Sequence, residues 1–382
     1  GYGLSPEIVQ LALLKSPAVI VTVDNGVSSV EGVALANDND VDVIITDHHL
    51  PGDTLPAASA IVNPNLKDSE FTSKAMAGVG VIYYVMSATR AVLRDRGWFE
   101  NRPLPNLADW LDLVALGTVA DVVPLDHNNR ILIHQGLRRI RAGRCRWGLK
   151  ALCKVAGRTL NKLDSQDLGF AIGPRLNAAG RLDDMTIGIR CLLAEDAATA
   201  SETATALDEL NQVRRLLEQE MVRDAELIVA GRDDTVDDRY GVCVYDPSWH
   251  QGIVGIVAGR LREKLHRPVI AFADAGDAAP DELKGSARSI SQLHVRDVLD
   301  TIASRYPGML VKFGGHAMAA GMSIKRVHYD RFTRAFDAAV RDELPQEALL
   351  PILLTDGTLA DEERTLAVAR LLAAAGPWGQ NF

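Results

Sequence analysis

Two short apolar runs separated by a helical pattern constrain the fold of this chain more than any other feature. Residues 18–23 and 41–46 are apolar enough to form buried strands, and residues 29–37 between them have the spacing of a helix. This order predicts a βαβ unit, in which the two strands run parallel. A third short run at residues 60–62 would extend the same sheet. The N-terminal part of the chain is therefore predicted to be an α/β domain built on a parallel sheet.

Each of these predicted strands ends at a polar side chain. Asp24 follows the first run, Asp47 the second and Asn63 the third. Ligands of open α/β sheets bind at the carboxyl ends of the strands, so we expect these residues to converge on one site. A helical pattern at residues 107–118 runs on into Asp121, which places another carboxylate at the end of an element.

A second α/β lobe is predicted in the C-terminal half of the chain. Apolar residues spaced by three and four between 194 and 229 indicate one long helix, which we interpret as the connector between two lobes. After a polar break at 231–239, strand-like runs at 241–245 and 268–272 flank a helical pattern at 253–265. A chain of 382 residues is long enough for two or three domains. The predicted fold class is α/β, with two α/β lobes joined by a long helix.

The remaining segments of this half are harder to assign from their pattern. Residues 285–289 and 314–316 are rich in small side chains, and we predict that both are loops. Residues 352–354 resemble a strand and residues 366–375 a helix, as at the start of a third unit.

The composition excludes several classes of protein. Acidic residues outnumber basic ones by 50 to 41, a net charge of −9, so a bound polyanion must be held by local basic clusters or metal ions. The four cysteines form no CxxC pair, which favours a reducing cytoplasm. No apolar run approaches the roughly 20 residues needed to span a bilayer. We therefore expect a cytoplasmic protein that does not bind membranes.

The sequence Thr46-Asp47-His48-His49, together with Asp24 and Asp121, indicates a metal site. Carboxylates and imidazoles form a mixed oxygen and nitrogen ligand shell, which suits Mn²⁺ and tolerates Mg²⁺ or Co²⁺. Two such ions placed close together catalyse phosphoester hydrolysis. Either motif alone also fits a structural role, as the cap of a strand or as a turn. Their shared position at strand ends favours the metal site.

These motifs resemble the DHH phosphoesterase superfamily. The resemblance rests on residues 23–26, 46–49 and 116–121, which look like three successive motifs of that family. Four further segments make the chain similar to the branch of bacterial single-stranded-DNA-specific exonucleases, and they lie at residues 172–181, 249–255, 285–289 and 312–316. The motifs keep their order, and the similarity extends over nearly the whole chain.

The resemblance implies a role for each residue of the predicted metal site. Asp24, His48 and Asp121 would be metal ligands, with Asp24 bridging two ions. His49 would face the substrate phosphate, and Asp47 would orient the imidazoles. The cofactor would be a pair of Mn²⁺ or Mg²⁺ ions. The Asp-rich first motif of the family is expected upstream of Gly1, so the two-metal site of this fragment is expected to be incomplete and the fragment alone inactive.

The resemblance also implies a set of residues that bind the nucleic acid. An Arg- and Asn-bearing loop would lie against the strand, and two Gly-rich segments would grip phosphate, because glycines let backbone N–H groups approach an anion. A tight structural loop and a simple turn are the alternatives for these segments. The predicted substrate-binding residues are Arg175, Asn177, Arg181, Ser286, Arg288, Gly314, Gly315 and His316.

Two further features of the sequence have two interpretations each. Six basic residues and no acidic residue lie between Arg138 and Lys150, with Trp147 among them. This cluster is typical of a backbone track with a stacking ring, but equally of a solvated helix face. Trp249 and His250 could contact DNA, although an aromatic side chain packed at the start of a helix fits as well.

The family implies the following domains: residues 1–193 form an N-terminally truncated DHH catalytic domain, 194–230 a connecting helix, 231–346 a DHH-associated substrate-binding domain, and 347–382 the start of a truncated OB-type domain. The implied function is a metal-dependent 5′-to-3′ exonuclease that degrades single-stranded DNA to 5′-mononucleotides in repair and recombination. The alternatives are a phosphoesterase of short oligonucleotides or cyclic dinucleotides, and an inactive scaffold. The implied partners are single-stranded DNA, a single-strand-binding protein and a RecQ-type helicase, and the implied state is a monomer.

Overall fold

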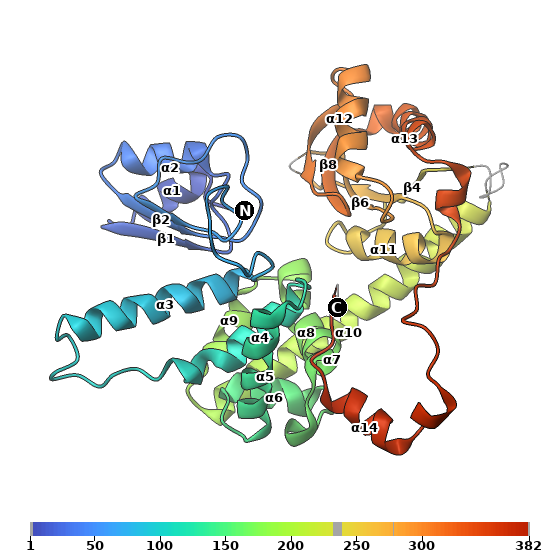
Figure 1. Cartoon of the computed structure of the whole chain (residues 1–382). Coiled ribbons are helices and arrows are strands. Elements are labelled where there is room, and N and C mark those ends of the chain that lie inside the picture. The colour runs from blue at the N-terminus through green and yellow to red at the C-terminus, as the bar shows by residue number, and fades with distance from the viewer. Residues whose placement is uncertain (1–2, 232–238, 278, 381–382) are drawn as a thin grey trace. The chain divides into compact units, whose positions relative to one another are not determined.

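A computed structural model describes residues 3–231, 239–277 and 279–380 of the chain (Figure 1). The chain divides into two compact units. Unit 1 comprises Gly1–Asn177, Met185–Asp208 and Leu359–Phe382, and unit 2 comprises Ala178–Asp184 and Glu209–Thr358. The predicted domain limits at residues 193, 230 and 346 stay predictions, and most of the predicted break at 231–239 lies outside the described residues.

Unit 1 contains the predicted parallel sheet. Its strands are β1 (Val19–Val23), β2 (Asp42–Thr46) and β3 (Ala60–Val62), which pair in parallel in the order β1-β2-β3. Helices α1 (Pro6–Leu13) and α2 (Val30–Asn37) lie on this sheet (Figure 1). Apolar side chains of the sheet and of both helices, such as those of Val43, Ile45, Val9 and Val33, form a buried core. The βαβ prediction is confirmed.

The rest of unit 1 is helical. The predicted helix before Asp121 starts as a 3₁₀ turn, Leu107–Trp110, and continues as α4, which ends one residue before Asp121. The helices are α3 (Gly78–Asp95), α4 (Leu111–Ala120), α5 (His127–Arg141), α6 (Trp147–Val155), α7 (Ser165–Asp167), a π-helix (Leu168–Ile172), α8 (Gly173–Leu182, shared with unit 2), α9 (Thr186–Leu193) and α14 (Leu366–Ala374).

The prediction that Arg175, Asn177 and Arg181 lie in a loop is wrong, because all three residues lie within helix α8. Pro174 misled the prediction. It is the second residue of α8, but the π-helix Leu168–Ile172 runs directly into α8, so the proline lies inside a continuous helical segment, at the irregular turn where the π-helix ends.

Unit 2 is built on a five-stranded mixed sheet in the order β4-β5-β6-β8-β7, in which only β4 and β5 run parallel. Rings of Phe272, Phe332 and Phe336 are fully buried in its core. The predicted connector is helix α10 (Ala197–Ala230), which passes from unit 1 into unit 2 (Figure 1). The other elements are β4 (Val242–Tyr245), α11 (Val254–Leu265), β5 (Val269–Asp274), β6 (Glu282–Arg288), α12 (Val295–Arg305), β7 (Leu310–Gly315), β8 (Ala319–Lys325) and α13 (Tyr329–Glu343).

The two loops predicted in unit 2 are largely strands. Residues 285–288 belong to β6, and Gly314 and Gly315 end β7, while His316 starts the turn to β8. Gly285 has a packing role, because a Cβ atom there would lie 2.4 Å from Cε1 of Phe272. At Gly285 the small side chain therefore marks close packing in the sheet rather than a loop.

Residues near the C-terminus follow the sequence predictions in part. Helix α14 matches the predicted helix, but residues 352–354 form no strand, and Ile352, Leu353 and Leu354 are 66%, 89% and 88% exposed. No neighbouring strand among the described residues pairs with this segment, so its apolar pattern has no sheet to join. In the described parts of the chain, no helix is both long and apolar enough to cross a membrane.

Candidate metal centre

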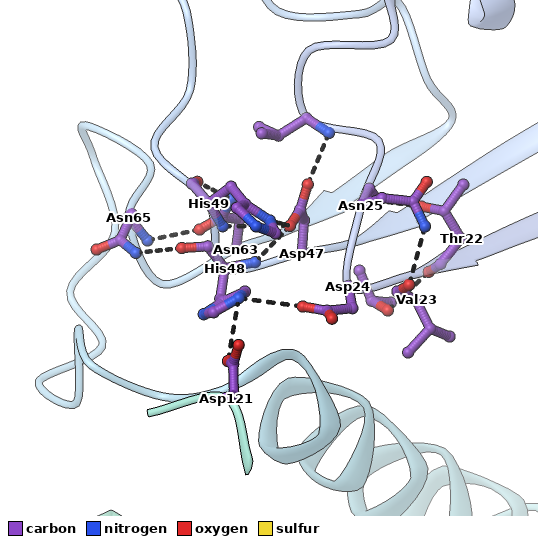
Figure 2. Close-up of polar contacts among 12 residues, drawn as sticks. Thr22, Val23, Asp24, Asn25, Asp47, His48, His49, Asn63, Asn65 and Asp121 are labelled. Atoms are coloured by element: carbon purple, nitrogen blue, oxygen red, sulfur yellow. Dashed lines mark hydrogen bonds and ion pairs between the residues drawn. The ribbon is translucent and has the colours of Figure 1, made fainter. Parts of the chain in front are cut away.

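The ends of the three parallel strands place the predicted site residues at one edge of the sheet. The strand ladder continues one residue past β1 and β2: the N–H of Asp24 donates to Thr46 O (2.9 Å), and that of Asp47 donates to Val62 O (3.1 Å). Asn63 follows Val62 directly. As the sequence predicts, Asp24, Asp47 and Asn63 therefore lie at the same carboxyl edge (Figure 2).

Asp24 is held in an unusual backbone conformation. Its φ angle of 65° lies in the left-handed region, which non-glycine residues rarely occupy and which is enriched at functional sites. Its carboxylate lies against the first residue of helix α3, because a Cβ atom on Gly78 would be 2.3 Å from Asp24 Oδ1. A glycine at position 78 is thus required for the carboxylate to fit.

Two carboxylates converge on the imidazole of His48. Its Nε2 lies 3.0 Å from Asp24 Oδ1 and 3.4 Å from Asp121 Oδ2 (Figure 2). Asp121 reaches the ring from the C-cap of α4. The Nε2 atom is buried, yet no hydrogen bond of good geometry satisfies it. A buried nitrogen that faces two carboxylates without such a bond is the arrangement expected of a metal ligand.

Asp47 orients His49 rather than both imidazoles. Its Oδ1 lies 2.7 Å from His49 Nδ1, and Oδ1 also accepts the backbone N–H groups of His48 (2.8 Å) and His49 (3.2 Å). Its Oδ2 accepts the N–H of Val27 at 2.9 Å. The prediction that Asp47 orients both imidazole rings is thus corrected. Asp47 contacts the ring of His49 but only the backbone N–H of His48, because the His48 ring points toward Asp24.

The pKa values of these groups follow from the contacts. Burial alone would raise the pKa of Asp47, but hydrogen bonds from the His49 ring and from three backbone N–H groups lower it to about 2. Burial would lower the pKa of His48, but Asp24 and Asp121 raise it above its ordinary value. The hydrogen bond to Asp47 raises the pKa of His49. Burial also raises the pKa of Asp121, although His48 opposes this. The space around His48 therefore favours positive charge.

The donor set fits a divalent cation. Asp24, His48 and His49 offer ligand atoms that all lie within 4.8 Å of one another, and Asp121 adds a further carboxylate. Carboxylate oxygens and imidazole nitrogens without a thiolate suit Mn²⁺ and Mg²⁺ better than a structural zinc ion. The roles of bridging ligand, ligand and phosphate contact stay predictions for the individual residues.

Two asparagines hold the histidine segment in place: Asn63, which the sequence places at this edge without a role, and Asn65, which the sequence did not indicate. Asn63 Nδ2 donates to His49 O at 2.9 Å, and Asn65 Nδ2 donates to His48 O at 2.6 Å (Figure 2). Both lie just after β3. Their position at the end of a predicted strand was the signal available in the sequence, but it could not show that they bind backbone carbonyls.

In unit 2, a second group of predicted residues comes together. Arg288 Nη1 donates to Ser286 Oγ at 3.0 Å. Burial lowers the pKa of Arg288, and the nearby charges of Arg181 and Arg262 lower it further. Three arginine side chains gathered in this way form a basic patch suited to an anion.

The strand register brings the predicted glycine segment beside this patch. Ser286 of β6 pairs with Gly321 of β8, which pairs with Gly314 of β7. A Cβ atom on either glycine would meet nothing within 4 Å, so the backbone is open there. Gly315 differs, because its φ of 146° and the carbonyl of Ala319 leave no room for a side chain. Gly321 was missed, since a lone glycine in a strand pattern carries no specific signal.

The remaining predicted residues have mixed environments. The Arg175 guanidinium pairs with Asp208 (2.7 Å) and donates to Ala171 O (2.6 Å), so it has a structural role within unit 1. Asn177 is exposed. Arg181 donates to Gly252 O at 3.2 Å within unit 2. Contact of these residues with DNA stays a prediction.

The basic cluster at 138–150 is largely engaged in internal contacts. Arg139 pairs with Asp109, and Arg141 donates to Leu163 O. Arg146 lies over the ring of Trp110 at 4.4 Å, and Lys150 over that of Trp147 at 4.6 Å. Outside this cluster, the predicted candidate Trp249 is 5% exposed and belongs to the core of unit 2, which confirms the packing interpretation.

Comparisons with known proteins identify both halves of the chain. The DHH family, N-terminal domain, matches residues 5–118, and the DHHA1 domain matches residues 237–342. The Single-stranded-DNA-specific exonuclease RecJ of Escherichia coli K12 is 55% identical over 388 residues, covering 100% of this chain and 66% of that protein. The protein of the same name in Bacillus subtilis 168 is 33% identical over 381 residues, covering 99% of this chain and 45% of that protein.

Solved structures agree with these matches. A crystal structure of RecJ in complex with Mn²⁺ from Thermus thermophilus has a TM-score of 0.79 and 31% identity, covering 98% of this chain and 52% of that chain. A crystal structure of exonuclease RecJ bound to manganese has a TM-score of 0.72 and 31% identity, covering 91% of this chain and 83% of that chain. The chain spans 66% of the length of the E. coli relative, so it corresponds to part of such a protein.

Proposed function

Because this chain belongs to the RecJ family of single-stranded-DNA-specific exonucleases, we propose that the full-length protein hydrolyses single-stranded DNA from the 5′ end and releases 5′-mononucleotides. The reaction requires Mn²⁺ or Mg²⁺ and serves DNA repair and recombination. One observation carries the proposal: His48 Nε2 is buried without a well-formed hydrogen bond and lies 3.0 Å and 3.4 Å from the carboxylates of Asp24 and Asp121. This convergence is what a phosphodiesterase metal site needs.

Each residue of the centre has a distinct task in this reaction. Asp24, His48 and Asp121 would hold the divalent cations, which neutralise the phosphoryl oxygens and activate the attacking water. Asp47 keeps its negative charge at neutral pH, since its pKa is about 2, and so fixes His49 through the 2.7 Å contact to Nδ1. This leaves His49 Nε2 to contact a phosphate oxygen of the substrate.

Residues of unit 2 would hold the phosphate backbone away from the reacting bond. The Arg288 side chain is fixed by Ser286, and Arg181 adds positive charge nearby. The open backbone at Gly314 and Gly321 lets a sugar-phosphate chain approach closely. Such contacts bind any sequence, as an exonuclease requires.

The test is nucleotide release from 5′- and 3′-labelled single strands by the full-length protein, with Mn²⁺ and with EDTA. We expect metal-dependent loss of the 5′ label, and Asp24→Asn should abolish it. Asp356→Asn, which changes an exposed carboxylate of unit 2, should leave it unchanged. Hydrolysis of dinucleotides alone would replace this proposal with a small-substrate phosphoesterase. DNA binding without hydrolysis under any metal would replace it with a scaffold.

We also infer a cytoplasmic location, supported by cysteines that are all free thiols: Cys145, Cys153, Cys191 and Cys243. A monomeric state, and contacts with a single-strand-binding protein and a RecQ-type helicase, are proposed from the family alone. Co-purification of the tagged full-length protein with each partner, and its mass in solution, test these points.

A further inference from the structure

The π-helix Leu168–Ile172 presents an aromatic ring to solvent. Leu168, Ala171 and Ile172 are buried, but Phe170 between them is 84% exposed. Single-turn π-helices are rare and occur frequently at functional sites. One exposed apolar side chain is common on protein surfaces and needs no explanation by itself. Whether Phe170 has a binding role therefore depends on the residues around it.

Phe170 lies beside the helix end that carries Asp121. A Cβ atom on Gly169 would be 3.2 Å from Val119 Cγ1, and one on Gly173 would be 3.7 Å from Ala120 Cβ. The π-helix therefore packs directly on the last turn of α4. Asp121 is the next residue after that turn, so the π-helix that carries Phe170 packs on the element that carries Asp121.

A cavity separates Phe170 from a second aromatic ring. Its volume is about 190 Å³, and Phe170 and Trp378 are the two rings that line it. Residues on both sides of Asp121, namely Thr118 to Ala120 and Val122, form another wall. The Thr118 hydroxyl is buried there and has no hydrogen-bond partner among the described residues. The cavity is thus mostly apolar, has an unsatisfied polar group and is lined by the residues directly before and after Asp121.

A nucleobase is the occupant that fits this place. Every base has an apolar face that stacks on an aromatic ring, whatever the sequence, and a polar edge. The cavity is continuous with residues next to Asp121, where the DNA backbone has to lie during hydrolysis. We propose that Phe170 stacks on a base of the single strand and so positions the adjacent phosphodiester at the metal centre. This inference rests on the proposed exonuclease function.

Binding of single-stranded DNA, measured in EDTA so that no hydrolysis takes place, tests whether Phe170 contributes to affinity. Fluorescence anisotropy of a labelled oligothymidylate is measured with the full-length protein and its Phe170→Ala and Phe170→Trp variants. Loss of one stacked base weakens binding about 5- to 150-fold, and the Trp variant should restore it. Leu353→Ala is the matched control, because Leu353 is 89% exposed and belongs to unit 2. It should bind like the wild type.

A second measurement distinguishes stacking from a structural effect. A single abasic nucleotide is moved along the strand, and binding is measured at each position with wild type and Phe170→Ala. We expect one position at which the abasic nucleotide weakens DNA binding by the wild type but does not weaken DNA binding by Phe170→Ala. Equal binding by Phe170→Ala and wild type, or equal abasic losses in both proteins, would overturn the inference. If the wild type binds DNA but releases no nucleotide in Mn²⁺, the exonuclease function is rejected. The comparison of intact and abasic strands still tests whether Phe170 stacks on a base, because it does not depend on hydrolysis.

Discussion

The buried carboxylate of Asp47 determines the geometry of the histidine segment. It is 1% exposed and accepts bonds from the His49 ring and from the N–H groups of Val27, His48 and His49. Its removal leaves buried donors without an acceptor, so Asp47→Ala should lower the free energy of unfolding by roughly 2–4 kcal/mol. Asp42→Ala removes an exposed carboxylate of the same strand, which accepts one hydrogen bond from Ser59 Oγ (2.7 Å), and should lower the free energy of unfolding by about 1 kcal/mol or less. Urea denaturation measures both, and equal losses would contradict the assigned role.

The thiols of unit 1 should react slowly in the folded protein. Burial raises the pKa of Cys145 to about 11 and that of Cys153 to about 12. In the unfolded chain a thiol has a pKa of about 8.5, so folding favours the protonated form, and this contribution to stability is lost as the pH rises from there through the folded values. Alkylation of native Cys145 at pH 8 should be roughly 100-fold slower than in urea. Mass spectrometry after timed iodoacetamide treatment measures it, and a native rate that levels off near pH 9 would contradict the shift.

At the scale of residues, the sequence predicted the candidate metal ligands better than the hydrogen bonds that hold them in place. Asp24, His48 and Asp121 were predictable because each follows a strand or helix whose pattern is clear. The bonds from Asn63 and Asn65 were not, because they depend on where backbone carbonyls come to lie after folding. A sequence pattern encodes the direction of elements but not these distances.

At the scale of elements, small side chains were the main source of error. Residues 285–288 were predicted as a loop but form strand β6, because Gly285 makes room for the ring of Phe272. Arg175 was predicted in a loop but lies in α8, since Pro174 follows a π-helix and the helical segment continues through the proline. Glycine occurs where space is short, and proline occurs where φ is fixed. Both conditions also arise inside helices and strands, so these residues do not by themselves indicate a loop.

The two kinds of glycine in the sheet of unit 2 lead to opposite expectations. Gly285→Ala places a methyl group 2.4 Å from the Phe272 ring and should destabilise the protein by about 1–3 kcal/mol. Gly321→Ala meets nothing within 4 Å and should leave the melting temperature unchanged or slightly raised. If the open backbone holds DNA, Gly321→Ala should still weaken binding of single strands. Calorimetry and anisotropy on both variants test this, and a stable Gly285→Ala protein would contradict the packing role.

At the scale of the whole molecule, net charge and local charge oppose each other. The chain carries −9 overall, yet its proposed substrate is a polyanion. Association must therefore depend on local cations and on the metal centre, and it should weaken steeply with salt. The basic cluster at 138–150 is the densest such segment in the sequence, but Arg139, Arg141 and Arg146 already have partners inside the protein.

The salt dependence of binding decides between the two interpretations of this cluster. Arg138 and Arg144 are exposed members with no cation–aromatic or ion-pair contact among the described residues. If both contact phosphates, replacing both by glutamine should reduce the slope of log affinity against log salt by about 1.4, at about 0.7 per charge for single strands. Lys15→Gln with Lys162→Gln removes two exposed charges elsewhere in unit 1 and should leave the slope unchanged. An identical slope in both double variants would assign the cluster to a solvated helix face, and DNA binding would then depend on the arginines of unit 2 and the metal centre.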